Sequence, residues 1–381
     1  RMILMSTYAL DQIPFKDVYI HGMLRNELGK KFSKSSGNNV DPLEVAAKFG
    51  TDALRLSLIS GISPGNDSRF YEEKVEGARN MVNKLWNIYR YIWLNIIINK
   101  KRKDDNEEIL WIDKVMLNKL EKLVDGITKD LNSYNFSQAG ERLREFTWND
   151  FADWYLEFLK MSNKAGMINY IFGALLKLWH PFIPFITETI YNNFYSNIGS
   201  EKNGEDLLMV QNWPLKEDVL IKSGRYNKEE IEFELIKEII IAIRNARSKN
   251  KVEPVKKIKA VIYAGNKKEL IESQTHLIKN LRTGLSELEV KEKGEKLVGA
   301  IYAAVGDVEI YLIGAVDKEK EKVRLKKEIS NFKKIIKAAK GRLANQEFID
   351  KAPPAVVAKE KNKLESRRAE LKKLAEQLKY L

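Results

Sequence analysis

The segment Lys31-Phe32-Ser33-Lys34-Ser35-Ser36-Gly37-Asn38-Asn39-Val40-Asp41-Pro42 decides how this chain is interpreted. Two lysines and three serines crowd a loop that leads through a glycine toward a helix start. Such a loop has little apolar surface to bury, whereas its ammonium and hydroxyl groups can neutralise the charge that develops on a leaving pyrophosphate. Loops rich in lysine and serine are also common as solvated turns, so the residues that follow are needed to choose between the two.

The residues after the loop favour the phosphate site. Asp41-Pro42-Leu43-Glu44 predicts a helix start, because aspartate is favoured as N-cap and proline at the first helical position. The loop resembles the Lys-Met-Ser-Lys-Ser signature of class I aminoacyl-tRNA synthetases, with Phe32 in place of methionine. Residues 48–55, Lys-Phe-Gly-Thr-Asp-Ala-Leu-Arg, resemble the Tyr-Gly-Ala-Asp-x-x-Arg run that follows this signature in the same family. Phe32 is a mild departure, because the methionine of the signature is an apolar anchor and carries no charge.

Composition excludes several classes of site. The 381 residues carry a net charge of +13, include no cysteine, and contain three histidines, which are scattered. Disulfides and cysteine-ligated zinc are therefore excluded, and we predict no bound metal. No apolar run approaches the ~18 residues of a membrane span, so we expect no membrane partner. We also predict a cytoplasmic location and a monomer. The chain starts Arg1-Met2-Ile3-Leu4-Met5, directly in apolar sequence, so we expect it to be a piece of a longer chain.

Hydrophobic periodicity divides the chain into segments that are mainly helical. Residues 70–226 read as a helical bundle, with helices expected over 72–98, 112–131, 136–163, 167–178 and 186–195. Three tryptophans of this segment, Trp86, Trp154 and Trp179, are interpreted as core residues rather than base-stacking platforms. Residues 227–315 read as a small α/β module, interpreted as a spacer. There we expect helices over 231–249 and 267–281, and strands over 258–263, 296–305 and 308–313.

Residues 316–381 are basic and periodic. They hold twenty Lys and Arg against ten Asp and Glu, a net charge of +10. Apolar residues at 325, 329, 332, 336, 339 and 343 have heptad spacing, and a second apolar run follows Pro353-Pro354. This pattern predicts an antiparallel coiled-coil hairpin with basic outer faces. So concentrated a charge indicates a polyanionic partner, with nucleic acid as the first candidate, although a solvated structural arm would show the same pattern.

The order of these parts resembles the C-terminal half of the valyl-tRNA synthetases, over essentially the whole chain. The resemblance is most specific in five stretches: Arg79–Asn87, Asp153–Glu157, His180–Phe185, Pro254–Lys257, and the Phe348-x-x-Lys351-Ala352-Pro353 loop. It implies that residues 1–69 are the end of a Rossmann-type catalytic domain and that residues 70–226 bind the anticodon arm. It also implies that residues 316–381 are a basic arm bound to the elbow of the tRNA.

In this family the carboxylate of valine attacks the α-phosphate of ATP, and the acyl group then passes to tRNA. The resemblance makes ATP with Mg²⁺, valine and valine tRNA the substrates. It assigns Lys34 as the residue that stabilises charge on the leaving phosphates, helped by Lys31, with Ser33 and Ser35 as further ATP-binding residues. Gly37 would let the loop swing. The tRNA-binding candidates are Arg79, Lys84, Arg142, Arg144, Lys333, Lys337, Arg367 and Arg368.

Other elements of the family are absent from this sequence. The His-Ile-Gly-His signature is missing, and Ile20-His21-Gly22 does not match it. We therefore predict that this chain alone neither activates valine nor edits mischarged tRNA. Two alternatives stay open. One is a fragment of an isoleucyl- or leucyl-tRNA synthetase, and the other is a non-catalytic RNA-binding protein that has a synthetase-like bundle. A phosphate loop argues against the second, because an RNA clamp needs neither lysine of that loop.

Overall fold

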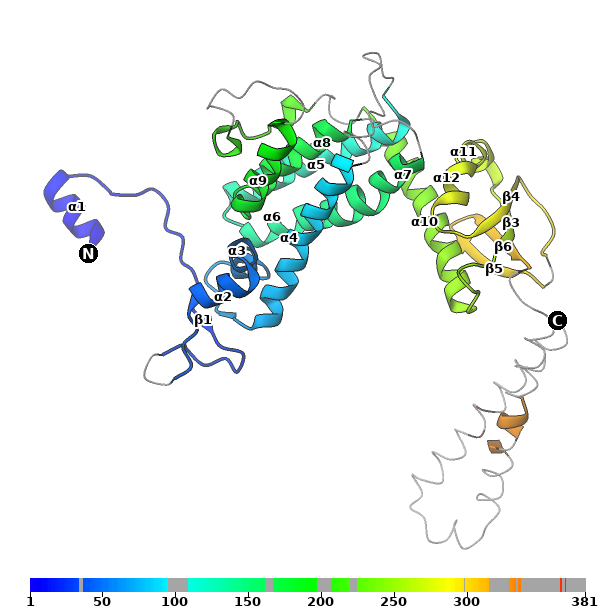
Figure 1. Ribbon diagram of the computed structural model, residues 1–381, viewed down its shortest axis with the longest axis horizontal. Helices are drawn as coiled ribbons and strands as arrows, with labels where there is room; N and C mark the ends of the chain where they lie inside the picture. Colours follow the sequence, from blue (N-terminus) through cyan, green and yellow to red (C-terminus); the bar gives the residue numbers. More distant parts are fainter. Residues whose placement is uncertain are drawn as a thin grey trace, which may run out of the picture. The chain divides into compact units, whose positions relative to one another are not determined.

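The computed structural model describes residues 1–33, 37–94, 109–161, 167–196, 207–219, 225–297, 299–314, 329–333, 335–336, 364 and 367. The described chain is mainly helical, with small sheets (Figure 1). It divides into two compact units, residues 1–233 and 234–381. The mainly α fold expected from the sequence is therefore confirmed at this level, and each unit is described by itself.

The first unit begins with short elements around the lysine-serine loop. They are α1 (Met2–Leu10), β1 (Leu24–Arg25), α2 (Pro42–Phe49), α3 (Thr51–Ile59) and β2 (Ser68–Arg69). The two short strands pair in parallel. The predicted helix start is confirmed, because the carboxylate of Asp41 accepts a hydrogen bond from the N–H of Leu43 at 2.8 Å and Pro42 is the first residue of α2.

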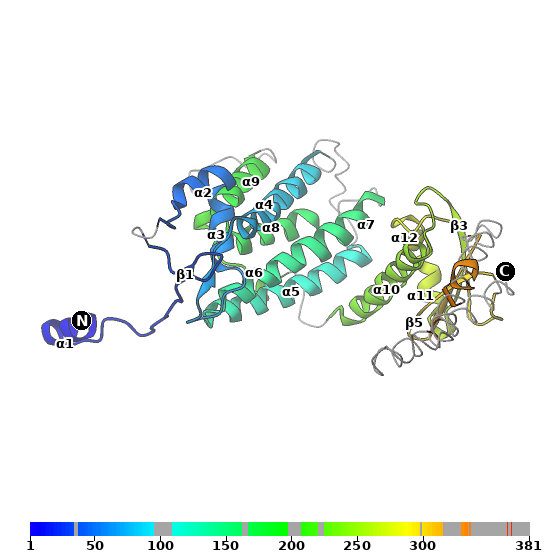
Figure 2. The ribbon, with the colours of Figure 1, turned by 90° about the horizontal axis from the view of Figure 1, so that it is seen from below.

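The helical bundle follows. It contains α4 (Glu72–Ile92), α5 (Trp111–Asn132), α6 (Phe136–Glu145), a π-helix (Phe146–Tyr155), α7 (Leu156–Met161), α8 (Ile168–Trp179) and α9 (Pro184–Ser196). Helices α5, α6 and α8 contact one another, as Figure 2 also shows. Trp179 is fully buried and donates its indole N–H to Thr147, while Trp154 is 6% exposed. The interpretation of these two tryptophans as core residues is confirmed; Trp86 is only half-buried.

One helix prediction in the bundle needs correction, and the end of another is not described. The single α-helix expected over 136–163 becomes a π-helix at Phe146–Tyr155, whose i→i+5 hydrogen bonds widen the turn. Periodicity of 3.6 residues does not reveal this change, which is accompanied by burial of Phe151, Trp154 and Tyr155. Helix α4 spans Glu72–Ile92 and continues as a π-turn at residues 93–94, and the expected end at residue 98 lies outside the described part of the chain.

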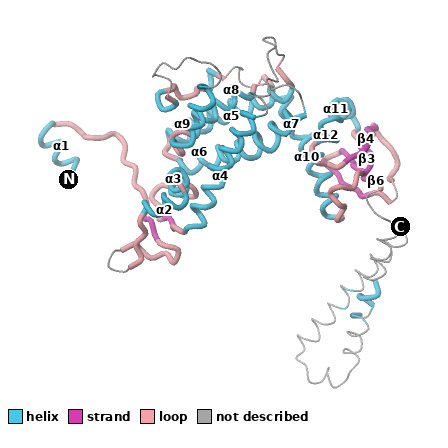
Figure 3. The backbone as a smooth tube through the Cα atoms, viewed as in Figure 1, coloured by secondary structure: helices cyan, strands magenta, loops and turns pink. Residues whose placement is uncertain are grey.

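The second unit joins helices to a sheet (Figure 3). Helix α10 (Asn227–Lys249) leads into it, followed by β3 (Ile258–Tyr263), α11 (Lys268–Ser273), α12 (Thr275–Asn280), β4 (Leu285–Lys291), β5 (Ile301–Val305) and β6 (Val308–Ile313). Among the described residues, these strands form a sheet with the order β4-β3-β6-β5. Strand β4 is parallel to β3, whereas β6 is antiparallel to both of its neighbours.

The α/β module also differs from its sequence prediction. The helix expected over 267–281 is two short helices that meet at Gln274, whose ψ of 13° breaks the regular helix. Strand β5 starts at residue 301 instead of 296, after Gly299 at a φ of 80°. Strand β4 was not predicted. The predicted hairpin lies largely outside the described residues, which include only short helical pieces of it, such as 329–333.

Candidate functional site

One side chain, Asn38, closes the base of the lysine-serine loop. Its Oδ1 accepts a hydrogen bond from the N–H of Ser33 at 2.9 Å, and its Nδ2 donates to the carbonyl oxygen of Lys31 at 3.1 Å. Gly37, which precedes it, has a φ of 63°, a conformation that glycine adopts without strain. Because the side chain of Asn38, on the second arm, bonds to two backbone groups of the first arm, it links the two arms at the base of the loop. The predicted site residues Lys34 and Ser35 lie outside the described residues.

The first arm of the loop is anchored by an aromatic contact. The ring of Phe32 packs edge-on against Phe70, with 6.4 Å between the ring centroids, and Phe70 is 9% exposed. This contact supports the interpretation of position 32 as an apolar anchor. Lys31 forms an isolated antiparallel bridge with Arg25, and its side chain is exposed. The structure therefore fixes the backbone of Lys31 and leaves its ammonium group accessible to a phosphate.

Asp67 holds the strand beneath the loop. Its carboxylate accepts hydrogen bonds from the N–H of Met23 at 2.7 Å and from Nε of Arg25 at 2.5 Å. The Met23 N–H, followed by the Arg25 guanidinium, lowers the pKa of Asp67 below its ordinary value. Gly22 lies so close to this segment that a Cβ atom there would be 1.8 Å from the carbonyl oxygen of Asn66. The approach of the two segments therefore requires glycine at position 22.

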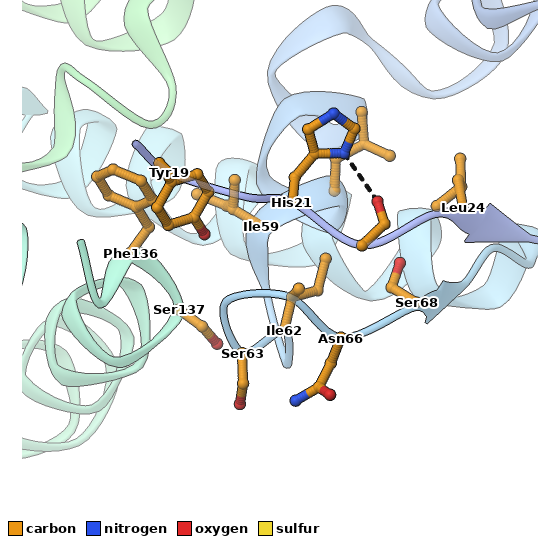
Figure 4. Close-up of a pocket in the computed structure, with 12 residues that line it drawn as sticks. Tyr19, His21, Leu24, Ile59, Ile62, Ser63, Asn66, Ser68, Phe136 and Ser137 are labelled. Carbon is orange, nitrogen blue, oxygen red and sulfur yellow. Dashed lines mark hydrogen bonds between the residues drawn. The ribbon is translucent and has the colours of Figure 1, made fainter. Parts of the chain in front are cut away.

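A cavity of about 230 Å³ lies beside these segments (Figure 4). Tyr19 and Phe136 face one another at its edge, with 5.6 Å between the ring centroids. Its other lining residues are His21, Gly22, Leu24, Leu58, Ile59, Ile62, Ser63, Asn66, Ser68 and Ser137. Nδ1 of His21 lies 2.8 Å from the carbonyl oxygen of Gly22, as drawn in Figure 4. The cavity is mostly apolar and contains no cluster of charges.

Asp52 and Arg55 fasten the loop-bearing segment to the bundle. The carboxylate of Asp52 accepts hydrogen bonds from the N–H groups of Phe185 and Ile186, in the first turn of α9, at 3.3 and 2.7 Å. Arg55 donates to the carbonyl oxygens of Pro181 and Phe182. Residues 48–55 and 180–185, two of the stretches that carry the resemblance described above, thus meet in the fold.

Burial shifts the pKa of two groups at this junction. Burial raises the pKa of Asp52, against the hydrogen bonds from Ile186 and Phe185 and the charge of Arg55, all of which favour the ionised carboxylate. Burial also lowers the pKa of His180, although the charges of Glu188 and Asp52 oppose this change. Nδ1 of His180 lies 2.9 Å from Oγ1 of Thr187. The junction therefore contains titratable groups whose first role is structural.

The predicted tRNA-binding residues of the bundle differ in their surroundings. Lys84 forms an ion pair with Asp153 and lies over the ring of Trp148, 4.7 Å from its centroid. Arg142 pairs with Asp130 at 2.6 Å, and Arg144 pairs with Glu141. Arg79 is exposed on α4 and has no ion pair among the described residues. Nothing in the described contacts brings the candidates on α4 and α6 into one site.

The remaining tRNA-binding candidates belong to the basic arm. Lys333 is exposed in the stretch 329–333, and Arg367 is half-buried. Lys337 and Arg368 lie outside the described residues. Within the part of the chain that the structure describes, no helix is both long and apolar enough to cross a membrane. The same residues contain no group of three or more acidic or histidine side chains that could hold a metal ion.

Sequence reasoning did not identify Asn38, Asp52 or Arg55 as positioning residues. Asn38 could have been suspected, since asparagine beside a glycine commonly bonds to the backbone of its own loop. Asp52 and Arg55 gave no such local signal, because their partners are more than 120 residues away in the chain. Their role follows from the tertiary structure alone.

Comparison with known protein families matches three parts of this chain. Residues 1–71 match "tRNA synthetases class I (I, L, M and V)", and residues 113–262 match "Anticodon-binding domain of tRNA ligase". Residues 317–381 match "Valyl tRNA synthetase tRNA binding arm". The three matches follow one another in the order that the sequence predicted for a phosphate loop, a bundle and a basic arm.

Individual proteins are similar to the chain along its whole length. A valine–tRNA ligase of Clostridium tetani is 38% identical over 100% of this chain and 44% of its own length. One of Clostridium acetobutylicum is 35% identical over 99% of the chain and 43% of its own length. One of Desulfotalea psychrophila is 33% identical over 100% of the chain and 44% of its own length. The chain therefore spans less than half the length of the curated relatives it matches.

Proposed function

This chain belongs with the valyl-tRNA synthetases, which it matches along its whole length, and from that premise we propose that it supplies the ATP-phosphate loop and the tRNA-binding parts of a valine–tRNA ligase. The observation that carries the proposal is the succession of synthetase, anticodon-binding and valyl-type arm matches in one chain. The valyl-type arm and the valine–tRNA ligase relatives favour valine over isoleucine or leucine as the amino acid.

The complete enzyme activates valine with ATP, which carries Mg²⁺, and transfers the acyl group to valine tRNA. Lys34 acts on the β- and γ-phosphates as charge grows there during departure of pyrophosphate. Such an interaction raises the rate because it is stronger in the transition state than in the ground state. Lys31 assists, and Ser33 and Ser35 donate hydrogen bonds. The base of the loop supports this assignment, since Asn38 and the packing of Phe32 hold the backbone of residues 31–33.

The four segments have separate proposed roles. Residues 1–69 are the end of a Rossmann-type catalytic domain, and residues 70–226 are the anticodon-binding bundle. Residues 227–315 link it to residues 316–381, an antiparallel coiled-coil arm that binds the elbow of the tRNA. The parallel pairing of β1 and β2 supports the first role, and the packed helices support the second. The arm's net charge of +10 supports the last. The protein works as a monomer in the cytoplasm.

The tRNA contacts of the bundle are assigned to Arg79, Lys84, Arg142 and Arg144. Those of the arm are assigned to Lys333, Lys337, Arg367 and Arg368. Three of the bundle candidates already have carboxylate partners, so an RNA phosphate would have to compete with these ion pairs. Arg79 has no ion pair among the described residues, so an RNA phosphate that binds it displaces no carboxylate.

The catalytic part of the proposal is tested in a full-length enzyme that carries this sequence. The measurement is pyrophosphate exchange into ATP, with valine, isoleucine or leucine added. We expect exchange that depends on valine and a loss of at least about 100-fold in Lys34→Ala, the effect of removing one preorganised group that stabilises transition-state charge. Lys30→Ala, just before the loop, is the matched control and should retain exchange. Equal exchange by Lys34→Ala and Lys30→Ala would remove Lys34 from the mechanism, and no exchange with valine would refute the proposed ligase activity.

A further inference from the structure

The second unit contains a cavity of about 690 Å³ that no proposed role accounts for. We call it the basic pocket. It is lined by the last turn of α10, residues 251–257, the end of α12 and the segment that leads into β4. One carboxylate, Glu253, contributes to the lining, against six basic side chains: Arg244, Arg247, Lys251, Lys257, Lys279 and Arg282. The pocket therefore has a strong excess of positive charge.

Two of the arginines serve the structure of the pocket. Arg244 donates through Nε and Nη2 to the carbonyl oxygen of Leu281, at 3.0 and 2.6 Å. Arg247 is 7% exposed and donates to the carbonyl oxygens of Gly284, Glu253 and Lys256. The carbonyl oxygen of Leu281 lies at the C-terminal end of α12, where the helix dipole is negative, and the Arg244 guanidinium offsets that charge. The Arg247 guanidinium instead binds carbonyl oxygens of the loops beside the pocket.

Three lysines of the basic pocket are not used in this way. Lys251 and Lys257 are exposed and Lys279 is half-buried. The side chains of all three have no ion-pair or hydrogen-bond partner among the residues that the structure describes, although the carboxylate of Glu253 belongs to the same lining. Three ammonium groups from two separate segments thus converge on one cavity, and their charge is available to an anion.

Two basic residues that line the pocket have a backbone conformation that is unfavourable for residues other than glycine. Lys251 and Arg282 have φ angles of 52° and 54°, in the left-handed region. Each follows the end of a helix, α10 or α12, where glycine or asparagine is the usual left-handed residue. Both side chains line the same cavity. Both helix ends therefore present a basic side chain to the cavity at a position where glycine would fit the backbone more easily.

We propose that the basic pocket binds phosphate groups of an RNA backbone. The inference rests on the proposed function, because it makes the tRNA the source of those phosphates, and it gives the module a role beyond that of a spacer. The lining contains no aromatic residue, so no base can stack there as on the platforms of single-strand binding proteins. Lysines act on phosphates as point charges and read no sequence. The pocket therefore contributes affinity without selecting one tRNA over another.

The test is binding of the full 381-residue chain to valine tRNA over a series of salt concentrations. The variant carries Lys251→Gln, Lys257→Gln and Lys279→Gln. The matched control carries the same change at Lys267, Lys293 and Lys296, which belong to the same unit and lie outside the pocket lining. Each lost phosphate contact lowers the slope of log K against log salt by roughly 0.7 to 0.9, so we expect a slope smaller by about 2 and at least a 10-fold weaker affinity for the pocket variant alone.

The outcomes separate this inference from the proposed function. If the unchanged chain binds tRNA, and the pocket and control variants lose the same affinity, the inference is wrong and the proposed function stands. If the unchanged chain does not bind tRNA, the proposed function itself fails. A third variant carries Lys251→Arg, Lys257→Arg and Lys279→Arg and keeps the charge. Its salt slope and its affinity for tRNA should equal those of the unchanged chain. Failure of arginine to restore them, with unchanged thermal stability, would show that the lysines do not act as phosphate-binding charges.

Discussion

Asn38 and Ser33 face each other across the lysine-serine loop, and Oδ1 of the first accepts the backbone N–H of the second at 2.9 Å. The same amide group also binds the carbonyl oxygen of Lys31. One neutral side chain thus fixes the arms of a loop whose lysines are proposed to act on ATP. Positioning by backbone contacts matters here because a catalytic charge that is misplaced by about 1 Å can cost 100-fold in rate.

Removing this amide should therefore weaken the reaction without weakening tRNA binding. In a full-length enzyme that carries the sequence, we expect Asn38→Ala to lower pyrophosphate exchange by up to about 30-fold, because two hydrogen bonds on the order of 1 kcal/mol each are lost and about 1.4 kcal/mol corresponds to a factor of ten. Asn39→Ala is the matched control, since its side chain is exposed and has no partner among the described residues. Equal rates for the two variants would show that Asn38 does not position the loop.

Asp52, on α3, should contribute to stability because it accepts hydrogen bonds from the first turn of α9. Asp52→Ala leaves the N–H groups of Phe185 and Ile186 without their acceptor, so we expect a loss of about 1 to 2 kcal/mol in the free energy of unfolding. Asp52→Asn keeps an acceptor oxygen and removes a buried charge, and it should remain close to the unchanged chain. Urea unfolding of the chain measures both. A large loss in the asparagine variant would mean that the negative charge, rather than the hydrogen bonds, is what stabilises the junction.

His180 should make stability depend on pH just below its ordinary pKa. Burial lowers the pKa of His180, so the folded chain binds fewer protons than the unfolded chain in this range. The corresponding stability is present above about pH 6.5 and is lost as the pH falls through the folded pKa. We expect the melting temperature to fall between pH 7.5 and 5.5, and to fall less in His180→Gln. His276→Gln, at an exposed position on α12, should behave as the unchanged chain. An equal fall in His180→Gln would exclude His180 as the cause.

Arg79 should contribute more to tRNA binding than Arg144, although the sequence analysis assigns both as tRNA-binding candidates. Arg79 is exposed without an ion pair among the described residues, whereas Arg144 already pairs with Glu141 at 2.8 Å. We expect Arg79→Ala to reduce the salt slope of tRNA binding by about 1, and Arg144→Ala to leave it nearly unchanged. The measurement is the affinity of each variant for tRNA at several salt concentrations. A larger effect of Arg144→Ala would show that its ion pair opens on binding.

Local sequence signals predicted those parts of the fold that depend on local forces. The start of α2 follows from Asp41 and Pro42, whose preferences act within one turn, and the structure confirms it. The helices of the bundle follow from apolar residues at helical spacing. The change to a π-helix at Phe146 did not follow, because i→i+5 bonding leaves no clear signature in a hydrophobic pattern of period 3.6.

The features that the sequence did not predict depend on contacts between residues far apart in the chain. Strand β4 contains few β-branched residues, and its parallel partner β3 is separated from it in the sequence by two helices, so its sequence alone did not reveal it. The contacts of Asp52 and Arg55 with residues 181–186 also depend on the packed fold. The loop itself was recognised from its residues, and the structure adds the amide of Asn38 and the contact between Phe32 and Phe70.

The most direct test of the account compares binding of this chain to three RNAs: valine tRNA, isoleucine tRNA, and valine tRNA with an altered anticodon. The account predicts a preference for valine tRNA that the altered anticodon abolishes, because the bundle is proposed to bind the anticodon arm. Equal and steeply salt-dependent binding to all three RNAs would contradict it, since basic side chains alone would then explain the interaction.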